Sequence, residues 1–159
     1  MKEIPLSRGL VALVDESDFD RLRAFRWCAT SRRYAYRHEQ VNGKQTGYAM
    51  HREIMGLSKD DPREVDHIDG NPLNNQRCNL RVCSHAENTQ NKRKGRRNAS
   101  GYKGVTWSKR DRRWQAQIMR AGKQKWLGLF PTAELAHAAY CQAADALHGQ
   151  FANYGASAV

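Results

Sequence analysis

The sequence has no apolar run near the roughly 20 residues that a helix needs to span a bilayer. Its first residues, Met1 to Pro5, show no signal-peptide core. The four cysteines form no Cys-x-x-Cys pair, which argues against a cysteine-bound zinc and fits semi-buried thiols in a reducing compartment. These absences predict a cytoplasmic protein without a membrane partner.

Acidic residues are nearly missing from one stretch of the chain. The whole chain has 159 residues and a formal net charge of +11. Between Lys92 and Lys125 there are 13 Lys and Arg residues but one acid, Asp111, which gives a local charge of +12. The rest of the chain, with 14 basic and 15 acidic residues, has a charge of −1. A run of like charge this dense repels itself, and a phosphate polymer relieves that repulsion. Nucleic acid is therefore the predicted partner.

The pattern of residues 1–50 predicts a β-rich extension. Ile4 to Val14 is rich in β-forming residues around a turn, and Ser17 is predicted to cap a short helix through Phe25. Asn42-Gly43 indicates a hairpin between two strands, because both residue types tolerate a positive φ. This block shows no chemistry of its own.

A basic linker at 96–100 separates a second block, residues 51–95, from a third block, residues 101–154. The third block predicts three strands, which are Tyr102 to Ser108, Trp114 to Arg120 and Gln124 to Phe130. Thr132 is predicted to cap the helix that follows, and Gly149 lies beyond the end of that helix.

Alternation along the middle strand sorts its side chains onto two faces. Trp114 and Ile118 face one way, whereas Gln115 and Gln117 face the other. A single helix covers only one face of a three-stranded sheet. The opposite face, which also carries Trp126, is therefore expected to remain free.

The polar stretch from Val65 to Val82 carries the strongest chemical signal. It predicts a short strand, a polar loop and a second short strand over 80–83, followed by a helix that begins near Ser84. Phosphodiester hydrolysis needs a base that activates water and a hard cation on the phosphate. Asp66 and His67 are adjacent, so on a regular strand their side chains face opposite ways, and a bend or bulge would bring both to one site.

The string DHIDGNPLNNQRCNLR, preceded by MHREIMG, resembles the HNH family of endonucleases, in the branch common among phage and group I intron homing enzymes. The resemblance runs from about Met50 to Asn91 and implies a ββα-metal finger, two strands and a helix around one divalent ion. The predicted fold class is therefore α+β: an HNH finger with a β-rich N-terminal extension, then a three-stranded antiparallel sheet packed on one helix. A bacterial or phage-infected host cell is the expected setting.

Carried over residue by residue, the resemblance implies a small site. His67 matches the general base, Asp66 and Asn88 match the protein ligands of the metal, and Asn79 matches the residue that ties down the loop and orients the base. Oxygen ligands suit Mg²⁺ (or Mn²⁺), one ion per active site, better than zinc. Lys92 stands where some relatives place a further His ligand, so solvent and DNA oxygens are expected to complete the metal's shell.

The third block resembles the plant apetala-two/ethylene-response-factor DNA-binding domain. The matching strings are GYKGV at 101–105, WQAQI at 114–118, WLG at 126–128 and TAELAHAAY at 132–140. In that family the sheet lies in the major groove of DNA and the helix packs on its back, which implies double-stranded DNA as the partner. Base-reading arginines of the plant proteins are replaced here, so the plant target sequence is not expected to transfer; the replacements are Thr106, Met119 and Gln124.

The expected DNA contacts come from the helix before the HNH motif, the basic linker and the free sheet face. For Arg52 the choice between a phosphate contact and structural packing stays open. The predicted contact residues are Arg52, Lys92, Arg93, Lys94, Arg96, Arg97, Lys103, Lys109, Arg110, Gln117 and Trp126.

These expectations describe a divalent-metal-dependent DNA endonuclease that nicks or cuts both strands and is targeted by a C-terminal module. A monomer with one active site is expected, with a dimer left open. One alternative is a DNA-binding regulator with a decayed nuclease domain, against which the intact Asp66, His67, Asn79 and Asn88 argue. The other is an RNA-binding or RNA-cutting protein, which the resemblance to a duplex-DNA reader disfavours.

Overall fold

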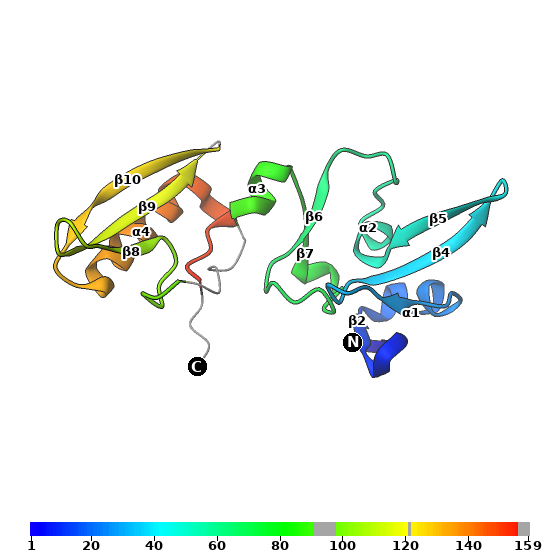
Figure 1. The fold of residues 1–159 in the computed structure, drawn as a ribbon. Helices are drawn as coiled ribbons and strands as arrows, with labels where there is room; N and C mark the ends of the chain where they lie inside the picture. The colour runs from blue at the N-terminus through cyan, green and yellow to red at the C-terminus, as the bar shows by residue number, and fades with distance from the viewer. Residues whose placement is uncertain (91–97, 121, 156–159) are drawn as a thin grey trace. The chain divides into compact units, whose positions relative to one another are not determined.

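The structure is a computed structural model that describes residues 1–90, 98–120 and 122–155 (Figure 1). The chain forms two compact units, Met1–Ser84 and His85–Val159. In the described ranges no helix is both long and apolar enough to cross a membrane.

The N-terminal unit contains three small antiparallel sheets, in the orders β1-β2, β3-β4-β5 and β6-β7, and several short helices. Its elements are β1 (Lys2–Pro5), η1 (Ser7–Gly9), β2 (Val11–Val14), α1 (Glu16–Arg23), β3 (Cys28–Ala29), β4 (Ala35–Val41), β5 (Lys44–Ala49), α2 (Met50–Ile54), β6 (Glu64–His67), η2 (Arg77–Asn79) and β7 (Leu80–Cys83).

Local signals in the first block predicted most of its elements. Asn42 and Gly43 connect β4 and β5 with φ values of 51° and 74°, so the predicted hairpin is confirmed. The predicted helix start at Ser17 was wrong, because α1 begins at Glu16 and its N-cap is Asp15. The Asp15 carboxylate makes no cap bond and accepts hydrogen bonds from the residues that precede and begin η2 instead.

One hydrophobic core joins the first block to the HNH region. Ile4 on β1, Val14 on β2, Leu22 on α1, Met50 on α2 and Leu80 on β7 belong to the same buried cluster, and each is at most 5% exposed. Residues 1–50 therefore pack onto the β6–β7 hairpin and share its core.

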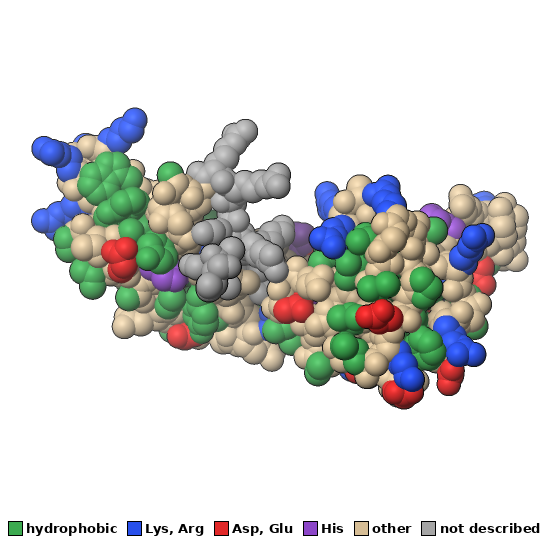
Figure 2. Space-filling model, turned by 90° about the horizontal axis from the view of Figure 1, so that it is seen from below, with side chains coloured by type: hydrophobic (Ala, Val, Ile, Leu, Met, Phe, Trp, Pro, Cys, Tyr) green, Lys and Arg blue, Asp and Glu red, His purple; other side chains and the backbone are tan. Residues whose placement is uncertain are grey.

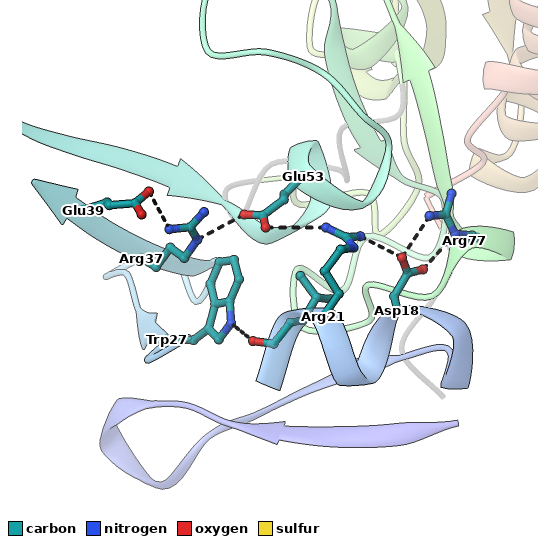
Figure 3. Close-up of polar contacts among 8 residues, drawn as sticks. Asp18, Arg21, Trp27, Arg37, Glu39, Glu53 and Arg77 are labelled. Carbon is teal, nitrogen blue, oxygen red and sulfur yellow. Dashed lines mark hydrogen bonds and ion pairs between the residues drawn. The ribbon is translucent and has the colours of Figure 1, made fainter. Parts of the chain in front are cut away.

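A chain of ion pairs also ties α1 to the loop before β7 (Figure 3). The Asp18 carboxylate, 3% exposed, accepts hydrogen bonds from Arg77 at 2.7 and 2.9 Å and from Arg21 at 2.8 Å. Arg21 reaches Glu53 on α2, which also pairs with Arg37 at 3.1 Å. Burial raises the pKa of Asp18, but the bonds from Arg77 and Arg21 outweigh it, so the pKa lies below its ordinary value.

Replacing Asp18 with Asn is expected to destabilise the protein by about 1.5 to 2 kcal/mol at pH 7, because a neutral amide accepts the bonds from Arg77 and Arg21 more weakly than the carboxylate does. A lowered folded-state pKa contributes stability above the unfolded pKa of about 3.9, and this stability is lost as the pH falls through the folded-state value. Denaturant unfolding at several pH values should therefore show the gap between parent and variant closing below about pH 4.

The control for this experiment is Asp20→Asn, since the Asp20 side chain is 89% exposed and its pair with Arg23 lies at the surface. We expect a change below about 1 kcal/mol at every pH. Equal losses of stability in the Asp18 and Asp20 variants would contradict the role of the buried network.

The C-terminal unit has a sheet of order β10-β9-β8 packed on one long helix, as predicted from the sequence (Figure 1). Its elements are α3 (His85–Gln90), β8 (Val105–Ser108), β9 (Arg113–Arg120), β10 (Lys123–Phe130), α4 (Ala133–His148) and η3 (Gly149–Phe151). Both pairs of neighbouring strands are antiparallel. The ββα-metal arrangement predicted for the HNH region stays a prediction, because α3 belongs to this second unit.

Helix α4 begins and ends where its sequence predicts. The Thr132 hydroxyl caps it by accepting from the Leu135 amide at 3.3 Å, and Gly149 with a φ of 51° ends it. The helix lies close to the chain at Gly104, just before β8, where an added Cβ would overlap the Tyr140 ring. Trp114 packs against the resulting core, as predicted.

Candidate active site and nucleic-acid interface

The antiparallel register of β6 and β7 positions the candidate metal ligand Asp66. Asp66 stands opposite Arg81, and cross-strand neighbours share one face of the hairpin. Arg81 donates two hydrogen bonds to Asp66 Oδ2, at 2.9 Å from Nε and 2.7 Å from a terminal nitrogen. Asp66 is 6% exposed, so this pair holds a charged carboxylate inside the unit.

His67, the candidate base, is the last residue of β6 and has different neighbours. Its ring lies 5.8 Å from that of Tyr34 and 5.2 Å from that of His51, measured between centroids. Its Nε2 lies 3.4 Å from Asn75 Oδ1. Because an amide oxygen only accepts hydrogen bonds, this contact requires the proton on Nε2 and leaves Nδ1 as the accepting nitrogen.

Burial keeps both histidines of this cluster neutral. Burial lowers the pKa of His67 below its ordinary value, although the bond to Asn75 and the charges of Asp69 and Asp66 act in the opposite direction. The pKa of His51 falls to about 3, mainly through burial and further through the charges of His67 and Arg52. A neutral imidazole at pH 7 is the form that can accept a proton.

The loop between β6 and β7 is closed by the side chain of Asn79. Its Oδ1 accepts from the Asp69 amide at 3.0 Å, and its Nδ2 donates to Asp69 Oδ1 at 3.0 Å and to the Asn74 carbonyl at 2.8 Å. These bonds tie down the loop, which is the structural part of the role that the resemblance implied for Asn79. A catalytic role for Asn79 stays a prediction.

The N-terminal extension holds the other side of the same loop. Leu13 on β2 donates its amide to the Leu73 carbonyl and accepts from the Asn75 amide, both at 2.8 Å. Asn75 is 1% exposed. The position of this partner of His67 thus depends on a strand that lies more than 50 residues earlier in the chain.

The donor set fits a hard divalent cation with few protein ligands. Asp66 offers carboxylate oxygen and Asn88 offers amide oxygen, the donors that Mg²⁺ prefers. Among the described residues no group of three or more His, Cys, Asp or Glu side chains is placed to hold a metal. Asp66 belongs to the first unit and Asn88, on α3, to the second, so their joint binding of an ion stays a prediction.

Arg52 has a structural use in this fold. Its guanidinium donates to the backbone carbonyls of Ser58, Asp61 and Arg63, at 2.6 to 2.9 Å. It therefore fastens the segment that leads from α2 to β6. A DNA phosphate at Arg52 would have to compete with these hydrogen bonds, and the predicted DNA contact of Arg52 stays a prediction.

The face of the C-terminal sheet opposite α4 is polar and exposed, as its alternation predicted. Gln117 stands opposite Trp126, whose side chain is 63% exposed, and Gln117 accepts a hydrogen bond from Gln124. Gln115 donates to the Thr106 hydroxyl at 2.8 Å. The face thus presents amide groups and one aromatic ring, which suit base edges and sugar surfaces.

Basic side chains border this unit (Figure 2). Figure 2 shows Lys and Arg side chains gathered around hydrophobic ones at its left end. Lys109 and Arg110 are exposed in the β8–β9 turn. Burial lowers the pKa of Lys103 to about 8, and its Cβ lies beside Gly155. The predicted contacts Lys92, Arg93, Lys94, Arg96 and Arg97 lie outside the described residues.

Sequence reasoning missed three residues around His67. Tyr34, His51 and Asn75 contact its ring, and only Asn75 lies in the same loop. The contact between Asp66 and Arg81 could have been predicted from the sequence, because the register of a hairpin places facing residues together. No local signal in the first block pointed to Tyr34.

Two protein families match the two parts of the chain. A family described as "HNH endonuclease" matches residues 59–90, and a family described as "AP2 domain" matches residues 100–150. The chain therefore belongs to the HNH endonuclease and AP2 domain families, as a fusion of the two domains.

Among known proteins, Protein 3.8 of Escherichia phage T7 is 39% identical over 90 residues, which are 57% of this chain and 74% of that protein. AP2-like ethylene-responsive transcription factor TOE2 of Arabidopsis thaliana is 42% identical over 60 residues, 38% of this chain and 12% of the plant protein. APETALA2-like protein 2 of Oryza sativa is 44% identical over 54 residues, 34% of this chain and 12% of that protein. No solved structure matches the chain.

Proposed function

We propose that the protein is a Mg²⁺-dependent DNA endonuclease that its C-terminal AP2 domain directs to duplex DNA. The observation that carries the proposal is the neutral, buried imidazole of His67, which directly follows Asp66 on the β6–β7 hairpin of an HNH domain. The exposed face around Gln117 and Trp126 supports DNA binding by the second domain.

In the proposed reaction His67 accepts a proton from water at Nδ1, and the resulting hydroxide attacks the phosphorus of a DNA phosphodiester. The bond from phosphorus to the 3′ oxygen breaks, and the 3′ oxygen leaves with the bonding electron pair and takes a proton from solvent. The products are a 5′-phosphate and a 3′-hydroxyl. Asn75 keeps the opposite nitrogen of His67 protonated. The two hydrogen bonds from Arg81 hold the Asp66 carboxylate in place.

Asp66 and Asn88 would hold the divalent ion, which would neutralise charge on the phosphate and on the departing oxygen. Only two protein ligands are proposed, so DNA and solvent oxygens would have to complete the shell of the ion. A monomer with one active site is expected to cut one DNA strand each time it binds. The host cytoplasm of a bacterium is the proposed setting.

Removal of the metal is expected to abolish cleavage. Supercoiled plasmid incubated with the protein and Mg²⁺ should become nicked, whereas excess EDTA should leave it intact, and gel electrophoresis separates the two forms. Added Mg²⁺ should restore nicking. If plasmid stays uncut with Mg²⁺ or Mn²⁺ while a gel shift shows DNA binding, the chain is a DNA-binding regulator with an inactive nuclease domain.

A further inference from the structure

The turn between β3 and β4 contains two arginines that the HNH and AP2 families do not account for. It runs from Thr30 to Tyr34 and lies outside both matched ranges, 59–90 and 100–150. The Thr30 amide donates to the Tyr34 carbonyl at 2.9 Å, and the Thr30 carbonyl accepts from Arg33 at 2.9 Å. The Thr30 hydroxyl also accepts from the Tyr34 amide at 3.0 Å. These bonds fix the shape of the turn.

The turn lies at the candidate base. Tyr34 is its last residue, and the Tyr34 ring lies 5.4 Å from the ring of His51 and 5.8 Å from the ring of His67. Arg32 and Arg33 directly precede Tyr34, and both are exposed. All of these residues belong to the N-terminal unit.

Unlike most arginines of this unit, the two arginines have no side-chain partner among the residues that the structure describes. In residues 1–84, all of which the structure describes, six arginines pair with carboxylates. They are Arg21, Arg23, Arg37, Arg63, Arg77 and Arg81. Neither Arg32 nor Arg33 forms an ion pair or a side-chain hydrogen bond there, and the stretch from Arg21 to His38 contains no acidic residue that would neutralise them.

The backbone of the turn favours a different residue at one of these positions. Arg33 has a φ of 67°, in the left-handed region that suits glycine. A hairpin turn of this kind normally places Gly there. An arginine at this position is less favourable for the fold than glycine, so replacing it with glycine is not expected to destabilise the turn.

We propose that the Thr30–Tyr34 turn is a phosphate-binding site, in which Arg32 and Arg33 hold DNA backbone phosphates beside the phosphate that is cleaved at His67. The proposal rests on the proposed function, since it assumes that DNA lies at His67. Guanidinium groups bind phosphate through paired hydrogen bonds, and unpaired exposed arginines lose no internal ion pair on binding.

The test measures binding of a short DNA duplex in EDTA over a series of salt concentrations, with the full-length chain. Arg32→Ala and Arg33→Gly should each reduce the slope of log K against log salt by about 0.9, and the double variant by about twice that. Arg33→Gly should do so without lowering the melting temperature, because glycine suits the positive φ. Arg33→Lys should restore most of the slope, since it keeps the charge.

The matched control is Lys44→Ala, which removes one exposed positive charge from the far end of the β4–β5 hairpin. A phosphate site at the turn predicts a smaller change of slope for this control. Equal changes in the control and the turn variants would overturn the proposal, because they would show a general effect of charge.

Cleavage assays run in parallel separate this proposal from the proposed function. The turn variants should raise the DNA concentration needed for half-maximal cleavage at least fivefold, with less than a twofold change in the rate at saturation. Unchanged slope and unchanged half-maximal concentration in an active nuclease would refute the turn site alone. A parent protein that binds DNA with the predicted slopes but never cleaves would refute the nuclease while supporting the turn.

Discussion

Replacing His67 with Ala is expected to lower the rate of Mg²⁺-dependent plasmid nicking about 10³-fold, while DNA binding stays within twofold of the parent. A positioned general base contributes roughly that factor, and His67 is a buried, neutral imidazole that directly follows Asp66 on β6. Single-turnover cleavage with saturating protein measures the chemical step separately from binding.

The matched control is His38→Ala, because His38 is exposed on β4 and its ring contacts only Tyr36 among the described aromatic residues. It should cleave at the parent rate.

The lowered pKa of His67 also predicts that parent activity persists below pH 6.5 and falls only when the pH drops through that lowered value. If the His67→Ala variant nicks plasmid at the parent rate, His67 is not the general base.

Deleting residues 96–159 is expected to weaken DNA binding at least 100-fold at moderate salt and to flatten its salt dependence by several units of slope. The deletion removes ten Lys and Arg residues, and with them the sheet face that carries Gln117 and Trp126. The N-terminal unit should stay folded, because its core extends only from Ile4 to Leu80. Titration of a fluorescent duplex measures both quantities.

Two further measurements separate the loss of DNA contacts from a loss of folding in the deletion variant. The truncated chain should keep a cooperative thermal transition, which shows that lost binding is not lost folding. In the full-length chain, Gln117→Ala with Trp126→Ala should weaken binding at an unchanged salt slope, because no charge is removed. If DNA binding by the truncated chain shows the same salt dependence as binding by the parent, the C-terminal part is not the main source of phosphate contacts.

Elements with strong local signals followed their sequence closely. The Asn42-Gly43 turn, the alternation along β9 and the limits of α4 depend on φ preference, period-two burial and capping, which are properties of neighbouring residues. The helix start at Ser17 was wrong because Asp15, two residues earlier, already has the extended backbone of an N-cap.

The candidate site was only partly readable. Asp66, His67 and Asn79 stood out because they form one short string with a known chemistry, and the loop bonds of Asn79 agree with its expected position. Tyr34 and His51 were not found, since each meets His67 through tertiary packing across a separation of 16 residues or more. Sequence periodicity carries no information about such contacts.

The sequence by itself determined the two family matches, the hairpin that carries the candidate base His67 and the candidate metal ligand Asp66, and the basic character of the C-terminal part, because each resides in a contiguous stretch. Only the tertiary structure decided that β2 of the extension holds the loop between β6 and β7, and that Tyr34 and His51 contact the ring of His67. It also decided that Arg32 and Arg33, next to Tyr34, have no ion pair among the residues that the structure describes. The physical reason is that hydrogen bonds and burial between distant segments arise from one shared core, which local patterns do not specify.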